Sequence, residues 1–318
     1  MITERFADRS NTDHKTFGVE SLQEILLRIQ QAWQDYETLS SEHDLIWVSH
    51  GDTLRVLLCF FQNLSLQFCH DLPYLNNAEF REIHPREKVK IAAHRGNSIQ
   101  FTENTMPAFR SGIELKSDFL ELDFHYTKDK VPIVIHDPDM NRVFGHDYKI
   151  SELYYSQVAE LTKREHTPPR LETVLDLSKQ NNTSILCEMK AGWLNENDLP
   201  ALIDDYKENL ELMDFNYQNL ISAQKTIDDL KCIWLIDHTD DWNKVIDMCK
   251  EHNFFCINPN KDLLLNNPHW IQDAKQEGLQ VYTWTVDKLE EGIELILAGI
   301  DVITTNNPGL FLDLNSVP

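Results

Sequence analysis

The chain has 318 residues, 42% of them hydrophobic, a length that allows one large α/β barrel or a barrel with a small second domain. Its formal net charge of −23 argues against nucleic-acid binding and against docking on an anionic membrane. No apolar run reaches the ~18 residues that cross a bilayer, and the N-terminus lacks the features of a signal peptide, so we expect a cytoplasmic protein without a transmembrane segment.

The N-terminal part of the chain begins with a predicted helix. Ser21 and Glu24 form a capping box, in which each side chain bonds the backbone N–H of the other residue. Apolar side chains then follow at helical spacing as far as Tyr36. A second helix is expected to start near Thr53.

Two apolar runs in the same part predict strands, at residues 44–48 and 78–83. The first leads into Ser49-His50-Gly51-Asp52. A short, polar, proline-containing stretch at 84–88 follows the second run. We therefore place a domain boundary at this seam, between a small α/β segment of residues 1–87 and a domain of residues 88–318.

After the seam, predicted strands alternate with predicted helices. Strands are expected at Val89–Ala93, Phe119–Phe124, Ile133–His136, Ser184–Met189, Leu220–Ser222, Ile233–Ile236, Phe254–Ile257, Gln280–Trp284 and Val302–Thr304. Helices are expected at Met106–Leu115, Leu171–Lys179, Leu199–Leu210, Asp241–His252, His269–Gln276 and Lys288–Ala298. This repeated pattern predicts a closed parallel barrel or a doubly wound sheet.

One connection breaks the alternation. Only a short segment separates the strand that ends at Phe124 from the one that starts at Ile133. Because a parallel pair needs a longer crossover, we expect a hairpin here. It would return His136 to the edge of the sheet that carries Asp123.

Polar side chains collect where the predicted strands end. Glu121 and Asp123 share one face of their strand because side chains alternate with a period of two. Active sites of α/β barrels lie at the carboxyl ends of the strands. The converging set is His94, Arg95, Glu121, Asp123, His136, Glu188 and Lys190.

This set has the chemistry of phosphoryl transfer at a metal ion. Three carboxylates form a hard oxygen site suited to Mg²⁺ or Ca²⁺, and a cation offsets the cost of burying them together. Arg95 and Lys190 can neutralise phosphate charge, and two histidines can serve as base and acid near neutral pH. Each residue alone also has a structural explanation, such as a simple ion pair between Glu188 and Lys190.

The order of motifs resembles the glycerophosphodiester phosphodiesterase family. The matching blocks are His94-Arg95-Gly96, Glu103-Asn104-Thr105, Glu121-Leu122-Asp123, Val134-Ile135-His136-Asp137, Pro169-Arg170-Leu171-Glu172, Glu188-Met189-Lys190, Trp284-Thr285-Val286 and Thr305-Asn306-Asn307-Pro308. The resemblance runs from about residue 88 to the C-terminus and implies a triosephosphate-isomerase-type (β/α)8 barrel. It also implies a substrate, a glycerophosphodiester, which would be hydrolysed to sn-glycerol 3-phosphate and an alcohol by way of a cyclic phosphate.

The same resemblance implies a role for each site residue. Its general acid/base pair corresponds to His94 and His136, its divalent-cation ligands to Glu121, Asp123 and Glu188, its phosphate contacts to Arg95 and Lys190, and an aromatic wall to Trp284. Asn306 stands where many relatives have aspartate. We expect this change to be tolerated, because the position has none of these roles.

The segment 1–87 resembles another family. Gly18-Val19-Glu20-Ser21 and the stretch 48–55, with His50, look like the C-terminal part of a histidine phosphatase of the phosphoglycerate mutase type. That family needs an Arg-His-Gly nucleophile motif, which occurs nowhere in the sequence. We expect a truncated, inactive remnant that packs on the barrel or supplies the surface of a homo-oligomer.

Two other functions stay open. A phospholipase D-type enzyme would use the same site on lysophospholipids, but the sequence has no obvious amphipathic lipid-docking helix and its charge is unfavourable. A regulatory or scaffold protein with an inactive barrel is the other alternative. The complete set of polar site residues speaks against it.

Overall fold

The computed structural model describes residues 20–40, 45–74, 76, 88–162, 166–194 and 199–312. The chain divides into two compact units between Lys88 and Val89. None of the helices in the described ranges combines the length and the apolar character that a bilayer-spanning segment needs. The converging set of polar residues, from His94 to Lys190, belongs to the larger unit.

The described part of the N-terminal unit is helical. Its elements are α2 (Leu22–Ser40), α3 (Asp52–Phe61) and the 3-10 turn η1 (Leu66–Phe68). The capping box is confirmed, since Ser21 N donates to Glu24 Oε2 at 2.9 Å and Glu24 N donates to Ser21 Oγ at 3.2 Å. Trp33 of α2 meets Phe61 of α3 edge to face, with ring centroids 4.9 Å apart. The two helices therefore pack through their apolar faces.

The strand expected at 44–48 is wrong where the structure describes it. Residues 45–48 have no strand conformation, and Ile46 and Val48 are 79% and 91% exposed. A strand needs a neighbour to pair with, and the described residues of this unit form none. Gly18, Val19, the expected strand at 78–83 and the seam up to residue 87 lie outside the described residues.

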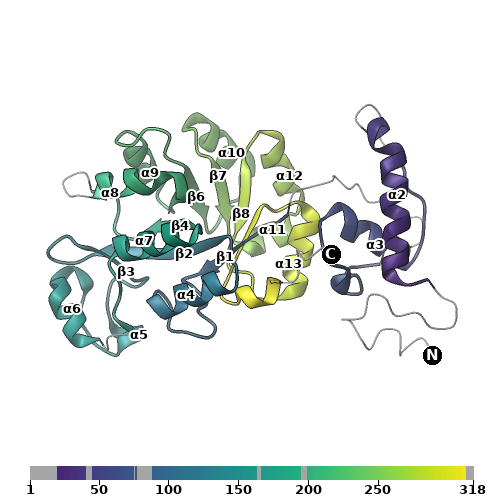
Figure 1. Cartoon of the computed structure of the whole chain (residues 1–318). Coiled ribbons are helices and arrows are strands. Elements are labelled where there is room, and N and C mark those ends of the chain that lie inside the picture. Colours follow the sequence, from purple (N-terminus) through teal and green to yellow (C-terminus); the bar gives the residue numbers. More distant parts are fainter. Residues whose placement is uncertain are drawn as a thin grey trace. The chain divides into compact units, whose positions relative to one another are not determined.

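Eight parallel strands of the larger unit close into a barrel, which confirms the triosephosphate-isomerase-type fold. They are β1 (Lys90–His94), β2 (Phe119–Tyr126), β4 (Ser184–Met189), β5 (Leu210–Asp214), β6 (Cys232–Ile236), β7 (Cys256–Pro259), β8 (Gln280–Thr283) and β9 (Val302–Thr305). Their order is β1-β9-β8-β7-β6-β5-β4-β2, and the pairing of β2 with β1 closes the ring. Figure 1 shows these strands surrounded by helices.

Helices connect successive strands of the barrel. They are α4 (Met106–Glu114), α7 (Leu171–Asn181), α8 (Leu199–Tyr206), α9 (Tyr217–Gln224), α10 (Trp242–Glu251), α11 (Lys261–Asn266), α12 (His269–Gln276) and α13 (Leu289–Ala298), with the 3-10 turn η4 (Lys207–Asn209) after α8. A further 3-10 turn, η5 (Pro308–Phe311), follows the last strand. In α10 the residues Trp242, Val245, Ile246 and Cys249 are buried, as their helical spacing predicts. One apolar stripe thus covers the sheet while the opposite side meets solvent.

The expected hairpin is confirmed. Strand β3 (Pro132–Val134) pairs antiparallel with β2. Just beyond it, Ile135 N donates to the backbone oxygen of Asp123 at 2.9 Å, which brings His136 beside the acidic strand. Three short elements that the sequence did not indicate follow and share a small apolar core with β3: α5 (Asn141–Phe144), η2 (Ile150–Glu152) and α6 (Tyr155–Leu161).

The strand expected at Leu220–Ser222 is wrong. Those residues lie in α9, which begins after a side-chain cap from Asn216. The strand is β5 instead, and its first residue was placed at the end of the predicted helix Leu199–Leu210. Glu211 and Asp214 interrupt the apolar run of β5, although both are buried. Hydrophobic periodicity in the sequence therefore does not predict this strand.

Candidate active site

A tight turn after β1 positions the first polar groups. Arg95 and Gly96 both adopt positive φ angles, 58° and 80°. A Cβ on Gly96 would lie 2.5 Å from the backbone carbonyl carbon of Ala108, so only glycine fits there. The turn leaves His94 at the carboxyl end of β1 and directs the backbone N–H of Arg95 to Glu121, whose Oε2 accepts it at 2.9 Å.

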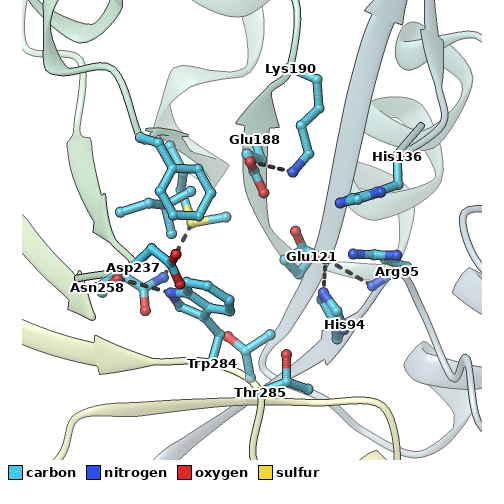
Figure 2. Close-up of a pocket in the computed structure, with 14 residues that line it drawn as sticks. His94, Arg95, Glu121, His136, Glu188, Lys190, Asp237, Asn258, Trp284 and Thr285 are labelled. Carbon is cyan, nitrogen blue, oxygen red and sulfur yellow. Dashed lines mark hydrogen bonds and ion pairs between the residues drawn. The ribbon is translucent and has the colours of Figure 1, made fainter. Parts of the chain in front are cut away.

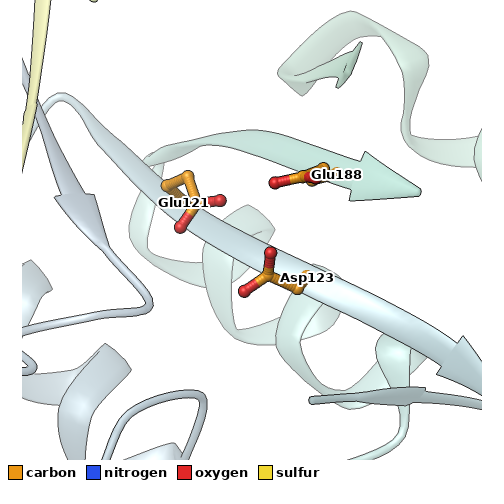
Figure 3. Close-up of side chains that lie close together, drawn as sticks. All are labelled: Glu121, Asp123 and Glu188. Atoms are coloured by element: carbon orange, nitrogen blue, oxygen red, sulfur yellow. The ribbon is translucent and has the colours of Figure 1, made fainter. Parts of the chain in front are cut away.

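Strand register gathers the three carboxylates. His94 lies opposite Glu121 in the pairing of β1 with β2, and Asp123 lies opposite Glu188 in the pairing of β2 with β4. Oxygen atoms of the three carboxylates lie within 4.8 Å of one another, and all three residues are buried. Figure 3 shows these side chains approaching one another from the two neighbouring strands.

Cationic and amide groups surround the cluster. Lys190 Nζ lies 2.6 Å from Glu188 Oε1 and 3.4 Å from Asp123 Oδ1. Arg95 Nε lies 3.3 Å from Asp123 Oδ2, and Asn104 donates to the same oxygen at 2.9 Å. Asp123 Oδ1 is buried, and apart from its ion pair with Lys190 it accepts no hydrogen bond from the described residues. A bound cation would add a partner to this oxygen.

Burial determines where the charge of the cluster lies. Burial and the negative charge of Asp123 raise the pKa of Glu188 to about 8 and raise the pKa of Glu121 well above its usual range. Burial would also raise the pKa of Asp123, but the charges of Arg95 and Lys190 outweigh it and lower that pKa to about 2. Both glutamates can lose their protons to a divalent cation. The three residues therefore fit a hard metal ion bound through oxygen.

His94 is held by an amide. Its Nδ1 lies 2.7 Å from Asn306 Oδ1, and Asn306 Nδ2 donates to Asp287 Oδ2 at 2.6 Å. The carboxylate of Asp287 thereby orients the amide so that its oxygen faces the imidazole. Nδ1 is then the donor, and Nε2 presents a lone pair 3.9 Å from Glu121 Oε2. Burial and the charge of Arg95 lower the pKa of His94 to about 4, so the ring is neutral at physiological pH.

His136 belongs to a network of charged groups. Its Nδ1 lies 2.7 Å from one oxygen of Asp137, and Arg142 Nε donates to the other oxygen at 2.6 Å. Arg142 also donates two hydrogen bonds to Glu103, at 2.7 and 2.8 Å. Glu103 in turn accepts from Arg95 at 2.9 Å. A continuous chain of contacts therefore joins His136 to Arg95.

Both histidines open onto one pocket of about 480 Å³, a volume usual for a small-molecule site. Its polar wall is formed by His94, Arg95, Glu121, His136, Glu188 and Lys190. Its other wall, at the carboxyl ends of β5 to β8, is formed by Met213, Phe215, Leu235, Asp237, Asn258 and Trp284. Figure 2 shows the two walls facing each other.

Comparison with protein families identifies the barrel. The model of the glycerophosphoryl diester phosphodiesterase family matches residues 94–310. The chain belongs to this family. The model of the histidine phosphatase superfamily (branch 1) matches residues 2–97, so a histidine phosphatase segment precedes the phosphodiesterase barrel.

Individual relatives agree with this assignment. A glycerophosphodiester phosphodiesterase of Caldanaerobacter subterraneus subsp. tengcongensis is 26% identical over 243 residues, which cover 71% of this chain and 98% of the relative. A lysophospholipase D of Homo sapiens is 38% identical over 80 residues, 24% of this chain and 26% of the relative. The structure of an Oleispira antarctica phosphodiesterase superimposes with a TM-score of 0.61 at 18% identity, covering 69% and 93% of the two chains. The last of these shows the common fold.

The structure brings together all the residues that the sequence indicated for this phosphodiesterase site. The pocket is lined by His94, Arg95, Glu121, His136, Glu188, Lys190 and Trp284, and Asp123 completes the carboxylate cluster. Asn306 stands where many relatives have aspartate, a change that was expected to be tolerated, and it is in contact with His94. The roles of these residues stay predictions.

Several residues of the site were given no role in the sequence analysis. Asp237 directly follows the predicted strand Ile233–Ile236, so the strand-end criterion would have found it. Phe215 could not be found in this way, because β5 had been misplaced. Glu103 and Arg142 lie 39 positions apart along the chain, and nothing in their spacing indicates that they form an ion pair.

Arg142 is expected to act as a positioning residue, because it contacts Asp137 and Glu103 and does not line the pocket. We predict that Arg142→Ala lowers kcat/KM about tenfold, since His136 and Arg95 lose their common support. Arg142→Lys should recover only part of this loss, because an ammonium cannot replace the planar fork of a guanidinium.

The matched control is Lys149→Ala, which removes an exposed ion pair with Glu152 from the same segment. Exposed pairs of this kind contribute little to stability, so activity and Tm should stay unchanged. Wild-type kcat/KM in Arg142→Ala would contradict the positioning role.

The metal-free protein is expected to lose stability as pH rises, because of Glu188. The pKa of this group is about 8 in the folded chain and ~4.3 in an unfolded chain. Between these values the folded state holds a proton that the unfolded state has lost. The contribution of Glu188 to the stability of the folded state is therefore fully present below the pKa of the unfolded chain. It is lost as the pH rises to the pKa of the folded chain.

Thermal unfolding in EDTA tests this expectation. Tm should fall between about pH 5 and about pH 8, and the fall should be smaller in Glu188→Gln, which cannot ionise. Added Ca²⁺ should oppose the fall, because it binds the deprotonated carboxylates of the folded state. Identical pH dependence in the wild type and in Glu188→Gln would show that another group is responsible.

Proposed function

We propose that the chain hydrolyses glycerophosphodiesters to sn-glycerol 3-phosphate and an alcohol, with Mg²⁺ or Ca²⁺ held by Glu121, Asp123 and Glu188. The proposal rests on one observation: three buried carboxylates meet His94 and His136 at a single pocket, in a chain of this family. The Oleispira antarctica phosphodiesterase was solved in complex with sn-glycerol-3-phosphate as its product, which supports the product named here.

The substrate is held between the two walls of the pocket. A bound cation would supply positive charge to the phosphate and to the glycerol 2-hydroxyl, and so lower the pKa of that hydroxyl. Arg95 and Lys190 add fixed positive charge beside the phosphate. Trp284 forms an aromatic surface against the part of the substrate that lies beyond the phosphate.

The hydrogen-bond partners of the two histidines favour different roles. His94 donates from Nδ1 to an amide oxygen and keeps a free lone pair on Nε2, so it removes the proton from the glycerol 2-hydroxyl. His136 places its Nδ1 against the carboxylate of Asp137, which orients the ring, so we assign His136 to protonate the leaving alcohol. The 2-oxygen attacks phosphorus and the bond to the alcohol breaks, which forms a cyclic phosphate. Water then opens the ring with the two roles exchanged.

A panel of glycerophosphodiesters tests this function. Each substrate is assayed in EDTA and again after Mg²⁺ or Ca²⁺ is restored. We expect sn-glycerol 3-phosphate and the free alcohol to be released only when the cation is present. Full turnover in EDTA would rule out the metal-dependent mechanism. Release of free glycerol and the phosphorylated alcohol would show that the bond to glycerol is cleaved, and so would rule out the proposed products.

Phospholipase D-type cleavage of lysophospholipids is the second candidate. The match to the human lysophospholipase D supports it. In addition, the loop after Gly96 exposes two apolar side chains, Ile99 at 65% and Phe101 at 36%, which could contact an acyl chain. Comparing lysophosphatidylcholine with glycerophosphocholine separates the two functions. An Ile99→Ser variant that loses turnover of the lysolipid alone would favour the second.

For the segment 1–87 we propose a histidine phosphatase-like segment without activity of its own. The sequence contains no Arg-His-Gly motif, and His50 is exposed. Arg55 is buried with its guanidinium 3.3 Å above the ring centroid of Tyr74, an arrangement that serves packing. Hydrolysis of p-nitrophenyl phosphate that depends on His50 would contradict the proposal. Sedimentation of the chain with and without residues 1–87 would show whether the segment supports a homo-oligomer.

A further inference from the structure

The wall of the pocket that faces the carboxylate cluster is built around two aromatic rings. Phe215 and Trp284 meet edge to face, with ring centroids 5.6 Å apart and planes at 87°. Trp284 Nε1 donates to the backbone oxygen of Asn258 at 3.0 Å, which holds the indole in place. Phe215 is 40% exposed, so a ligand can reach its ring. The wall thus presents π-electron density to the contents of the pocket.

An acidic group completes this wall. Asp237 directly follows β6 and lines the pocket near Trp284 (Figure 2). No residue in the described ranges donates a hydrogen bond to its carboxylate or forms an ion pair with it. The two cations of the polar wall have other partners, because Lys190 pairs with Glu188 at 2.6 Å and Arg95 pairs with Glu103 at 2.9 Å. Asp237 therefore adds a negative charge that the pocket does not compensate.

Such a charge is unfavourable for an ordinary anionic substrate. A phosphodiester is itself negative, and the chain already carries a net charge of −23. One more carboxylate beside the binding site weakens the binding of an anion, unless the substrate places a positive charge there. Aromatic faces next to a carboxylate are the environment in which proteins bind ammonium groups, and quaternary ammonium groups in particular.

We propose that this pocket prefers glycerophosphodiesters whose head group is a cationic amine, and that Asp237, Phe215 and Trp284 bind that amine. The inference rests on the proposed function, because it assumes that the phosphate lies at the carboxylate cluster. The phosphodiester would then span the pocket, with its negative part at the metal site and its positive part against the aromatic wall. A zwitterionic substrate matches both walls.

Exchange of the carboxylate for an amide tests the preference. The quantity to measure is the ratio of kcat/KM for glycerophosphocholine to kcat/KM for glycerophosphoglycerol, whose head group is uncharged. We expect the wild type to favour glycerophosphocholine and Asp237→Asn to lower the ratio about tenfold. The control is Asp240→Asn, which removes an exposed negative charge from the same loop outside the pocket and should keep the ratio. An unchanged ratio in Asp237→Asn, or an equal change in both variants, would overturn the inference.

A binding experiment separates this inference from the proposed function. In the His136→Ala background with Ca²⁺ present, calorimetric titration compares glycerophosphocholine with glycerophosphoglycerol, with and without Asp237→Asn. If the wild type hydrolyses neither compound but glycerophosphocholine still binds more tightly in an Asp237-dependent manner, the proposed function fails and the cation preference stands. If both compounds are hydrolysed and bound equally well, the proposed function stands and the cation preference fails.

Discussion

Glu121→Gln and Asp123→Asn are each expected to lower kcat/KM by about 10³-fold, because each replaces an anionic metal ligand by a neutral amide. Both side chains are buried, and their oxygen atoms lie within 4.8 Å of those of the third carboxylate, Glu188. Affinity for Mg²⁺ or Ca²⁺, measured by calorimetry, should fall together with activity. Removal of the cation with EDTA should have the same effect on the wild type, and restored cation should reverse it.

Glu211→Gln is the matched control for these substitutions. Glu211 is also buried on a barrel strand, β5, and burial raises its pKa, but it does not line the pocket. The amide should therefore change stability more than it changes metal affinity or turnover. Retention of wild-type activity in Glu121→Gln would remove the basis of the metal site. A loss in Glu211→Gln as large as in Glu121→Gln would mean that the loss follows from disturbance of the barrel.

His136→Ala and His94→Ala are both expected to lower kcat/KM by ~10²–10⁴-fold with a poor leaving group such as choline. They should differ when the leaving group is p-nitrophenol, which departs without protonation. His136→Ala, which lacks the proposed acid, should then lose much less activity. His94→Ala should lose as much as before, because the glycerol 2-hydroxyl still needs a base.

The control for this pair is His269→Ala, at an exposed histidine of α12 that does not line the pocket. It should match the wild type with both substrates. If the good leaving group instead restored activity to His94→Ala, His94 would be the acid and His136 the base. The mechanism itself would be unchanged. Equal losses with both substrates in both variants would show that neither histidine protonates the leaving alcohol.

The fold class could be predicted from the sequence because its signals are local. Alternation of short apolar runs with amphipathic helices depends on neighbouring residues only, and it placed β4 and α12 to the residue. The hairpin at β3 followed from the length of one connection. Where a local signal was mixed, the prediction failed. β5 carries the buried acids Glu211 and Asp214, and the apolar run at 45–48 found no partner among the described residues.

The residue types of the site were also determined by the sequence. Polar residues that follow buried strands must meet at one rim once the strands are parallel, whatever the details of packing. This geometric necessity explains why His94, Glu121 and Glu188 could be assigned to a common site from strand ends alone. Their joint chemistry, hard oxygen ligands with imidazole nearby, then follows from the side chains themselves.

Only the tertiary structure decided how these side chains are held and what else they meet. His94 and Asn306 are separated by 212 positions, and their hydrogen bond exists because the closing of the barrel brings β9 beside β1. The ion pair of Arg142 with Glu103 likewise depends on where the segment beyond β3 folds. Contacts of this kind depend on strand register and on closure of the barrel, and both result from many weak interactions along the whole chain. The periodicity of the sequence reflects only the local interactions that form helices and strands. The orientation of each acid and base depends on the packing of the whole barrel.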